Sequence, residues 1–316
     1  SLEVIEAASK YIDDKIKENG SVFGGAIKES LSPKDRKKQA AVIAPILRGL
    51  CSSDQRMVGH FDDQEAVLEF INSKDLDQLA PMGTSCPDHF LRTKISPLVL
   101  PLSAEINLTD SDEIRNHLIP LFEAYRKDYN DYYETHKHPN SPAVRDSNPV
   151  IILFPGLGLF SFAKNKQTAR VAAEFYVNAI NVMRGAEAIS SYTSLPRQEA
   201  FDIEYWLLEE AKLQRMPKEK PLSRQVALVT GAGGGIGRAI ADKLIAEGAV
   251  VIFSDISDDF LAEATVNYST DQAISVNCNV TDDEEIDNML NQSCLAFGGV
   301  DIIVHSAGLA ISKSIE

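Results

Sequence analysis

The stretch Thr230-Gly-Ala-Gly-Gly-Gly-Ile-Gly237 decides the fold of the second part of this chain. It follows the apolar run at 226–229 and leads into a helical pattern with Ile240 and Leu244 on one face. Glycines at such a point permit a tight turn and let the backbone approach a pyrophosphate, whose charge the free N–H groups at the start of the helix can hold. In this strand–glycine–helix context, the stretch predicts a dinucleotide-binding site.

The composition is typical of a globular protein with about two domains, since the chain has 316 residues, of which 44% are hydrophobic and 24% charged. A net charge of −15 argues against nucleic-acid binding, which needs a basic surface. The sequence shows neither an apolar run of membrane-spanning length nor a basic-then-apolar leader. We therefore expect a cytoplasmic protein, and we interpret its widely spaced cysteines as reduced: Cys51, Cys86, Cys278 and Cys294.

Strand and helix patterns alternate regularly after residue 222, with strands at about 226–230, 249–254, 273–278 and 300–305 and helices at about 235–247, 258–266 and 282–297. Such alternation predicts a parallel, doubly wound α/β sheet. The earlier part mixes helices at about 2–18, 35–51, 64–71, 112–135, 166–184 and 198–213 with strands at about 98–102, 150–154 and 158–162. A charged, proline-bounded segment at 214–221 separates the two parts, so we predict an α/β domain at 1–213, a linker, and a second domain at 222–316.

The second domain resembles the short-chain dehydrogenase/reductase family, because Thr230, Gly231, Gly235 and Gly237 match the Thr-Gly-x3-Gly-x-Gly turn of that family. The resemblance implies the amino-terminal half of a Rossmann-type sheet that binds NAD. Asp255 ends the second strand, where a carboxylate accepts ribose hydroxyls and repels a 2′-phosphate, which favours NAD over NADP. By the same resemblance, the expected cofactor-binding residues are Thr230, Gly231, Gly235, Ile236, Gly237, Asp255, Asn279, Val280, Ser306, Ala307 and Gly308.

Two of these segments depart from the family pattern. Asn279-Val280 stands where the family usually has Asp-Val beside the adenine, and His305-Ser306-Ala307-Gly308 stands in place of Asn-Asn-Ala-Gly. The active Tyr-x3-Lys of the family would follow residue 316, and the pairs with that spacing at Tyr11 and Tyr133 lie before the dinucleotide motif. We therefore assign no catalytic residue to this chain.

Residues 150–184 resemble the closing unit of class II aldolase/adducin domains, in which two apolar strands flank Asn-His-Gly and a helix follows. In that family the histidine binds a metal ion, and Leu157 takes its place here. His136 and His138 alone are too few for zinc, so we predict no metal site. Residues 1–213 are then a non-catalytic aldolase-like copy that begins, at about 1–20, with the end of a preceding domain. In the polar loop at 83–94, Arg92 and Lys94 either meet a phosphate or belong to a hydrogen-bonded loop.

An aldolase-like domain joined to a short-chain dehydrogenase resembles the bifunctional rhamnulose-1-phosphate aldolase/lactaldehyde (alcohol) dehydrogenase proteins. The resemblance implies a fragment of a homo-oligomeric enzyme of rhamnose catabolism that uses NAD and a small aldehyde or alcohol. We expect the 316-residue chain alone to be inactive. The alternative hypothesis is a non-catalytic module that binds dinucleotide or serves in assembly.

Overall fold

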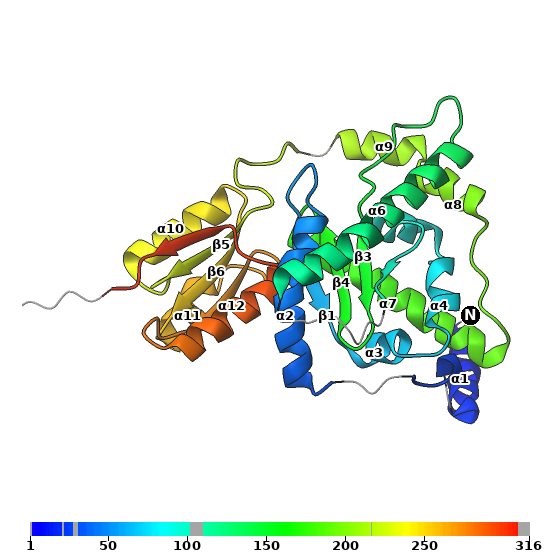
Figure 1. Cartoon of the computed structure of the whole chain (residues 1–316), viewed down its shortest axis with the longest axis horizontal. Helices are drawn as coiled ribbons and strands as arrows, with labels where there is room; N and C mark the ends of the chain where they lie inside the picture. The colour runs from blue at the N-terminus through cyan, green and yellow to red at the C-terminus, as the bar shows by residue number, and fades with distance from the viewer. Residues whose placement is uncertain (1, 21, 28–30, 102–109, 216, 309–316) are drawn as a thin grey trace, which may run out of the picture.

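The computed structural model describes residues 2–20, 22–27, 31–101, 110–215 and 217–308, which form two α/β domains side by side (Figure 1). The first domain is built on a four-stranded sheet with the order β1-β4-β3-β2. Its strands are β1 (Val58–Asp62), β2 (Leu98–Val99), β3 (Ile151–Phe154) and β4 (Gly158–Ala163). Only β2 and β3 are parallel, because β4 returns from β3 in a hairpin and pairs with β1 in the opposite sense.

Helices cover both faces of this first sheet. Alternate side chains of β3 separate the two layers: Ile151 and Leu153 pack with α7, and Ile152 packs with α2 and α6. The bounds of the helices are α1 (Leu2–Asn19), α2 (Pro33–Leu50), α3 (Glu65–Ile71), α4 (Leu76–Leu79), α5 (Phe90–Thr93), α6 (Ser111–His136), α7 (Lys166–Ile189), α8 (Arg197–Glu204) and α9 (Leu207–Gln214).

The second domain has a parallel sheet with the order β7-β6-β5-β8. Its strands β5 (Val226–Thr230), β6 (Val250–Asp255), β7 (Ala273–Asn277) and β8 (Ile302–His305) alternate with α10 (Gly235–Ala246), α11 (Asp258–Thr265) and α12 (Asp283–Phe297). Val229 and Phe253 pack towards α10 and α11, while Leu228 and Ile252 pack towards α12. The predicted α/β class, with a doubly wound parallel sheet in the second domain, is confirmed.

Three details differ from the sequence-based expectations. Strand β1 was not predicted, since its sequence Val-Gly-His-Phe-Asp lacks an alternating apolar pattern. The helix expected at 198–213 is interrupted at Tyr205, whose hydroxyl lies 2.7 Å from that of Tyr129. Helix α12 begins at Asp283 rather than at 282, because Asp282 is its N-cap and accepts from the amides of Glu284 and Glu285.

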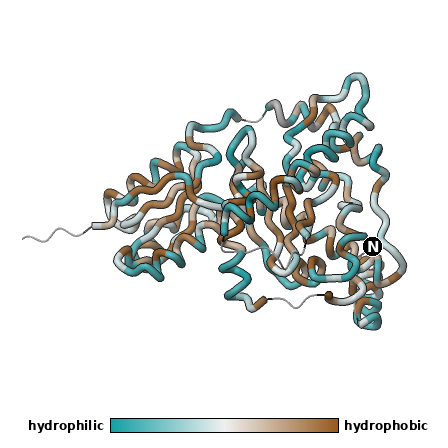
Figure 2. Tube along the Cα trace, viewed as in Figure 1, coloured by the Kyte–Doolittle hydropathy of each residue, from teal (hydrophilic) through white to brown (hydrophobic). Residues whose placement is uncertain are grey.

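Apolar residues concentrate along the strands of both domains, as Figure 2 shows. Among the described helices, none combines the length and apolarity needed to cross a bilayer. The expected strand at 98–102 is confirmed only at its start, because β2 ends at Val99 and residues 102–109 lie outside the described residues.

Candidate functional site

A cavity of about 780 Å³ opens where β5, β6, β7 and β8 end. In open parallel sheets ligands bind at this carboxyl edge, where neighbouring connections run to opposite faces. The lining combines the glycine turn with the segments that follow the other strands: Gly231, Gly234, Gly235, Ile236, Gly237, Asp255, Ile256, Phe260, Cys278, Asn279, Val280, Thr281, Ser306, Ala307 and Gly308. Every residue predicted for the cofactor therefore lines this cavity, except Thr230.

The glycine turn is held by close backbone contacts that no larger residue would permit. A Cβ on Gly237 would lie 2.2 Å from the carbonyl oxygen of Gly231. Gly231 itself has φ +66°, and a Cβ there would lie 2.8 Å from the Cα of Ala307. Gly235 is different, since nothing lies within 4 Å of the position its Cβ would take. The turn therefore packs against the end of β8 on one side and leaves space at the start of α10.

Helix α10 begins at this turn without a side-chain cap. Gly234 is its N-cap residue and offers no side chain to accept from the first amides of the helix. Ile236, in the first turn, is 76% exposed. The amino end of a 12-residue helix, with its positive partial charge, therefore faces the cavity.

The carboxylate of Asp255 lies between the cavity and the glycine turn. One of its oxygens accepts from the amide of Gly233 at 3.0 Å, and the other accepts from the amide of Ser257 at 3.1 Å. A carboxylate has about four acceptor positions, so these two bonds leave further positions for a ligand hydroxyl. Asp255 thus orders the turn and also presents negative charge at the cavity wall.

Apolar side chains form the remaining walls. Ile256, Phe260 and Val280 all line the cavity and are exposed. Ile256 and Phe260 were not predicted to line the site, and neither were Gly234, Cys278 and Thr281. Most of these are direct neighbours in sequence of predicted residues, and that adjacency could have identified them as lining residues. Phe260 carries no such signal, because it reaches the cavity from the first turn of α11.

Thr230 does not line the cavity. It is buried, and its hydroxyl oxygen accepts from the amides of Ser306 at 3.2 Å and Ala307 at 3.3 Å. The last residue of β5 therefore fixes the segment that follows β8. Asn279 is also engaged, because its side-chain oxygen accepts from the amide and the hydroxyl of Thr281.

The residues on which the prediction of no metal site depends have other contacts in the first domain. Leu157, at the β3–β4 turn, is 2% exposed and belongs to the apolar cluster between the sheet and helices α2 and α6. His136 lies 2.8 Å from the carbonyl oxygen of Tyr132, and His138 lies 2.8 Å from Asp202. Within the described ranges, no three His, Cys, Asp or Glu residues gather as a metal site would require.

Lys94, at the end of the polar loop at 83–94, is bound to distant segments of the first domain. The Nζ of Lys94 donates to the carbonyl oxygens of Asp146 and Asn148, and it lies 4.1 Å from the centroid of the Tyr129 ring. Burial lowers the pKa of Lys94 to about 8. Of the two interpretations offered by the sequence, these contacts favour the hydrogen-bonded loop for Lys94.

Comparison with known proteins matches each domain to a family. The family model for the second domain of class II aldolases matches residues 38–213. The family model for short-chain dehydrogenases matches residues 225–316. The uncharacterized oxidoreductase YuxG of Bacillus subtilis (strain 168) is 35% identical over 321 residues, which cover 100% of this chain and 46% of YuxG. The uncharacterized oxidoreductase SAR2567 of Staphylococcus aureus (strain MRSA252) is 39% identical over 94 residues, which are 30% of this chain and 41% of SAR2567. The chain thus spans less than half the length of these relatives.

Proposed function

Because the chain belongs to the class II aldolase family and continues into a short-chain dehydrogenase domain, we propose that the second domain binds a nicotinamide dinucleotide at the carboxyl edge of its sheet. One observation carries this proposal. The glycine turn and the uncapped start of α10 face a cavity that Asp255 and residues 306–308 also line. Backbone amides, a carboxylate and apolar walls are the groups that a pyrophosphate, a ribose and a planar base require.

The lining residues divide naturally among the parts of such a ligand. Gly235, Ile236 and Gly237 would hold the pyrophosphate through their amides, and Asp255 would hold the ribose of the adenosine. Val280 and Asn279 would lie beside the adenine, and residues 306–308 beside the second ribose. A bound nicotinamide supplies or accepts hydride, whereas the residues named here bind and orient the dinucleotide.

Asp255 makes NAD the preferred dinucleotide in this proposal. The extra 2′-phosphate of NADP would face a like charge, and that repulsion costs about 1 kcal/mol in water and about 4 kcal/mol in partly buried surroundings. NADH should therefore bind from about fivefold to several hundredfold more tightly than NADPH. Titration of the chain with both dinucleotides, followed by nucleotide fluorescence, measures the ratio.

The variant Asp255→Asn should reduce the preference for NADH over NADPH, because the amide side chain carries no negative charge. Asp259→Asn is the matched control, since Asp259 is an exposed acid on the first turn of α11 that does not line the cavity. Tighter binding of NADPH by the unmodified chain would contradict the assignment of NAD. Failure of both dinucleotides to bind would contradict the proposed site itself.

We further propose that the chain is part of a longer enzyme of sugar catabolism, similar to the bifunctional rhamnulose-1-phosphate aldolase/lactaldehyde dehydrogenases. The pairing of the two families supports this, as do the oxidoreductase names of the relatives and the greater length of YuxG. In this proposal the aldolase-like domain described here is a non-catalytic copy, because Leu157 is buried in the core where that family places a metal ligand. A cytoplasmic location and a homo-oligomeric state remain predictions.

The substrate proposal is tested with the longest natural form of the protein that contains this chain. L-Lactaldehyde and NAD should give NADH, and rhamnulose 1-phosphate should be cleaved. The 316-residue chain alone should do neither at a useful rate. Turnover of lactaldehyde by that chain would overturn the expectation of inactivity, and turnover of neither substrate by the longer protein would refute the sugar-catabolic assignment.

A further inference from the structure

The first domain contacts the parallel sheet at the end opposite the cavity. Asp301 lies immediately before β8, and Asp271 lies in the turn before β7. Arg48 of α2 binds Asp301, and Arg170 of α7 binds Asp271 with two hydrogen bonds of 3.0 and 2.9 Å. In Figure 1 the strands of the second domain accordingly point away from the first domain. The dinucleotide cavity is therefore left open, and the domain contact acts on the sheet from its amino end.

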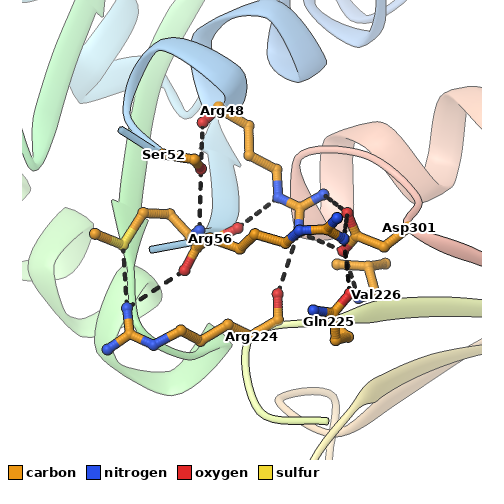
Figure 3. A network of polar contacts seen from close by, with 8 residues as sticks. Arg48, Ser52, Arg56, Arg224, Gln225, Val226 and Asp301 are labelled. Carbon is orange, nitrogen blue, oxygen red and sulfur yellow. Dashed lines mark hydrogen bonds and ion pairs between the residues drawn. The ribbon is translucent and has the colours of Figure 1, made fainter. Parts of the chain in front are cut away.

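Arg48 and Asp301 form the centre of this contact (Figure 3). The guanidinium of Arg48 donates to both carboxylate oxygens of Asp301, at 3.1 and 2.6 Å, and to the carbonyl oxygen of Arg224 at 3.2 Å. The side chains of Arg48 and Asp301 are only 8% and 11% exposed. A buried bidentate pair of this kind fixes geometry as well as charge, because loss of one partner leaves the other charge buried and poorly compensated.

Asp301 also holds the start of the β5–β8 ladder. Its carboxylate accepts from the amide of Val226 at 2.8 Å, and its own amide donates to the carbonyl oxygen of Val226, also at 2.8 Å. From there β8 runs parallel to β5, from the pair Ala227–Ile302 to the pair Thr230–His305. No other described strand pairs with β8, so its position depends on this one ladder, on the packing of Ile302 and Val304 against the core, and on the contacts at its two ends.

The far end of the same ladder carries the cavity wall. Thr230 accepts from the amides of Ser306 and Ala307, and residues 306–308 line the cavity. The spacing between Gly231 and Ala307 is set by contact, since even a Cβ on Gly231 would lie 2.8 Å from the Cα of Ala307. A shift of β8 along β5 would therefore move one wall of the cavity against the glycine turn.

We propose that Arg48, although it belongs to the aldolase-like domain, is a positioning residue for dinucleotide binding. It fixes Asp301 and the start of β8, and through the short ladder with β5 it sets the place of residues 306–308. This inference rests on the proposed function. In this proposal, the aldolase-like domain holds the parallel sheet of the second domain in the form that binds dinucleotide.

The 316-residue chain provides its own matched control. Arg56 touches the same carboxylate, at 2.9 Å from Asp301, but its side chain is 54% exposed. Arg48→Met and Arg56→Met therefore remove the same kind of group from one carboxylate at a buried and an exposed position. Arg48→Lys keeps the charge but cannot span both oxygens of Asp301, so it should lie between the unmodified chain and Arg48→Met.

Two measurements are made on each variant: affinity for NADH, and amide hydrogen exchange in the absence of ligand. Arg48→Met should weaken NADH binding by about tenfold or more and should speed exchange in β8, with the exchange of β3 unchanged. Arg56→Met should leave both within about twofold. If Arg48→Met does not fold, Asp301→Asn is judged by the same two measurements.

Three outcomes would overturn the inference. If amide hydrogen exchange in β8 is the same in Arg48→Met as in the unmodified chain, Arg48 does not order the strand. Faster exchange in β8 with unaltered NADH affinity would show that the strand does not position the cavity wall. Equal effects of Arg48→Met and Arg56→Met would show that burial of the pair is irrelevant. Absence of NADH binding by the unmodified chain would instead refute the proposed function, while hydrogen exchange still reports whether Arg48 orders β8.

Discussion

We expect Lys166 to make the stability of the domain contact depend on pH. Its Nζ donates to the carbonyl oxygen of Ala296 in α12 and lies 2.7 Å from the Nδ1 of His60 in β1. The residue is 7% exposed, and burial lowers the pKa of Lys166 from 10.5 to about 7. Burial likewise lowers the pKa of His60 to about 3, so that this imidazole is neutral above pH 5.

The sign of the pH effect follows from the protons bound by each state. Between pH 7 and pH 10.5 the unfolded chain keeps the proton on this lysine, whereas the folded chain releases it. The free energy of unfolding therefore rises with pH in this window. For a folded-state pKa of about 7, the rise between pH 7 and pH 9 is about 2 kcal/mol. Lys94, whose pKa is lowered to about 8, adds a rise of the same sign.

In the variant Lys166→Met, the free energy of unfolding should rise less between pH 7 and pH 9, because the contribution of this lysine is lost. Urea unfolding at pH 7 and pH 9 measures the rise in the unmodified chain and in the variant, and the difference between the two rises should be about 2 kcal/mol. Lys10→Met is the control, because Lys10 is exposed on α1 and should keep the full rise. Equal rises in the unmodified chain and in Lys166→Met would refute the argument, whatever the absolute stabilities.

The remaining predictions concern close contacts and metal. Gly237→Ala should weaken NADH binding by about tenfold or more, because its Cβ would lie 2.2 Å from the carbonyl oxygen of Gly231. Gly235→Ala, with open space at its Cβ, should retain much more affinity in the same titration. Gly59→Ala should destabilise the chain by about 1–3 kcal/mol in urea, since its Cβ would lie 2.9 Å from the Cα of Gly298 across the domain contact. Gly49→Ala, within α2 and without neighbours at its Cβ, should instead stabilise it slightly. Elemental analysis should find zinc far below one equivalent per chain, and a stoichiometric content would contradict the metal-free interpretation.

Local sequence patterns were sufficient for most of the second domain. The apolar runs, the glycine turn and the alternating helices predicted β5 to β8 and the parallel class, because each signal lies within a few residues of the element it specifies. They also predicted which segments gather at the carboxyl edge, since in a parallel sheet the end of every strand reaches the same side. The role of these residues in binding NAD stays a prediction.

Strand β1 depended on tertiary structure. Val58 is buried in a cluster with Val226, Leu228 and Phe297 of the second domain, and Gly59 lies against Gly298. A strand whose buried face is completed by another domain does not show the apolar alternation of a strand buried within its own domain. The interruption between α8 and α9 has a similar origin, because the hydroxyl of Tyr205 meets that of Tyr129 from a helix far away in sequence.

The sequence by itself determined the two families, the parallel sheet and the loops at its carboxyl edge, because these follow from local periodicity and from glycine. Only the tertiary structure decided how the two domains act on one another. Arg48 and Asp301 are 253 residues apart, and as single charged residues they carry no periodic signal. Their pairing required both domains to fold and then to bury the same small surface, and that surface fixes the end of β8 that lies farthest from the cavity.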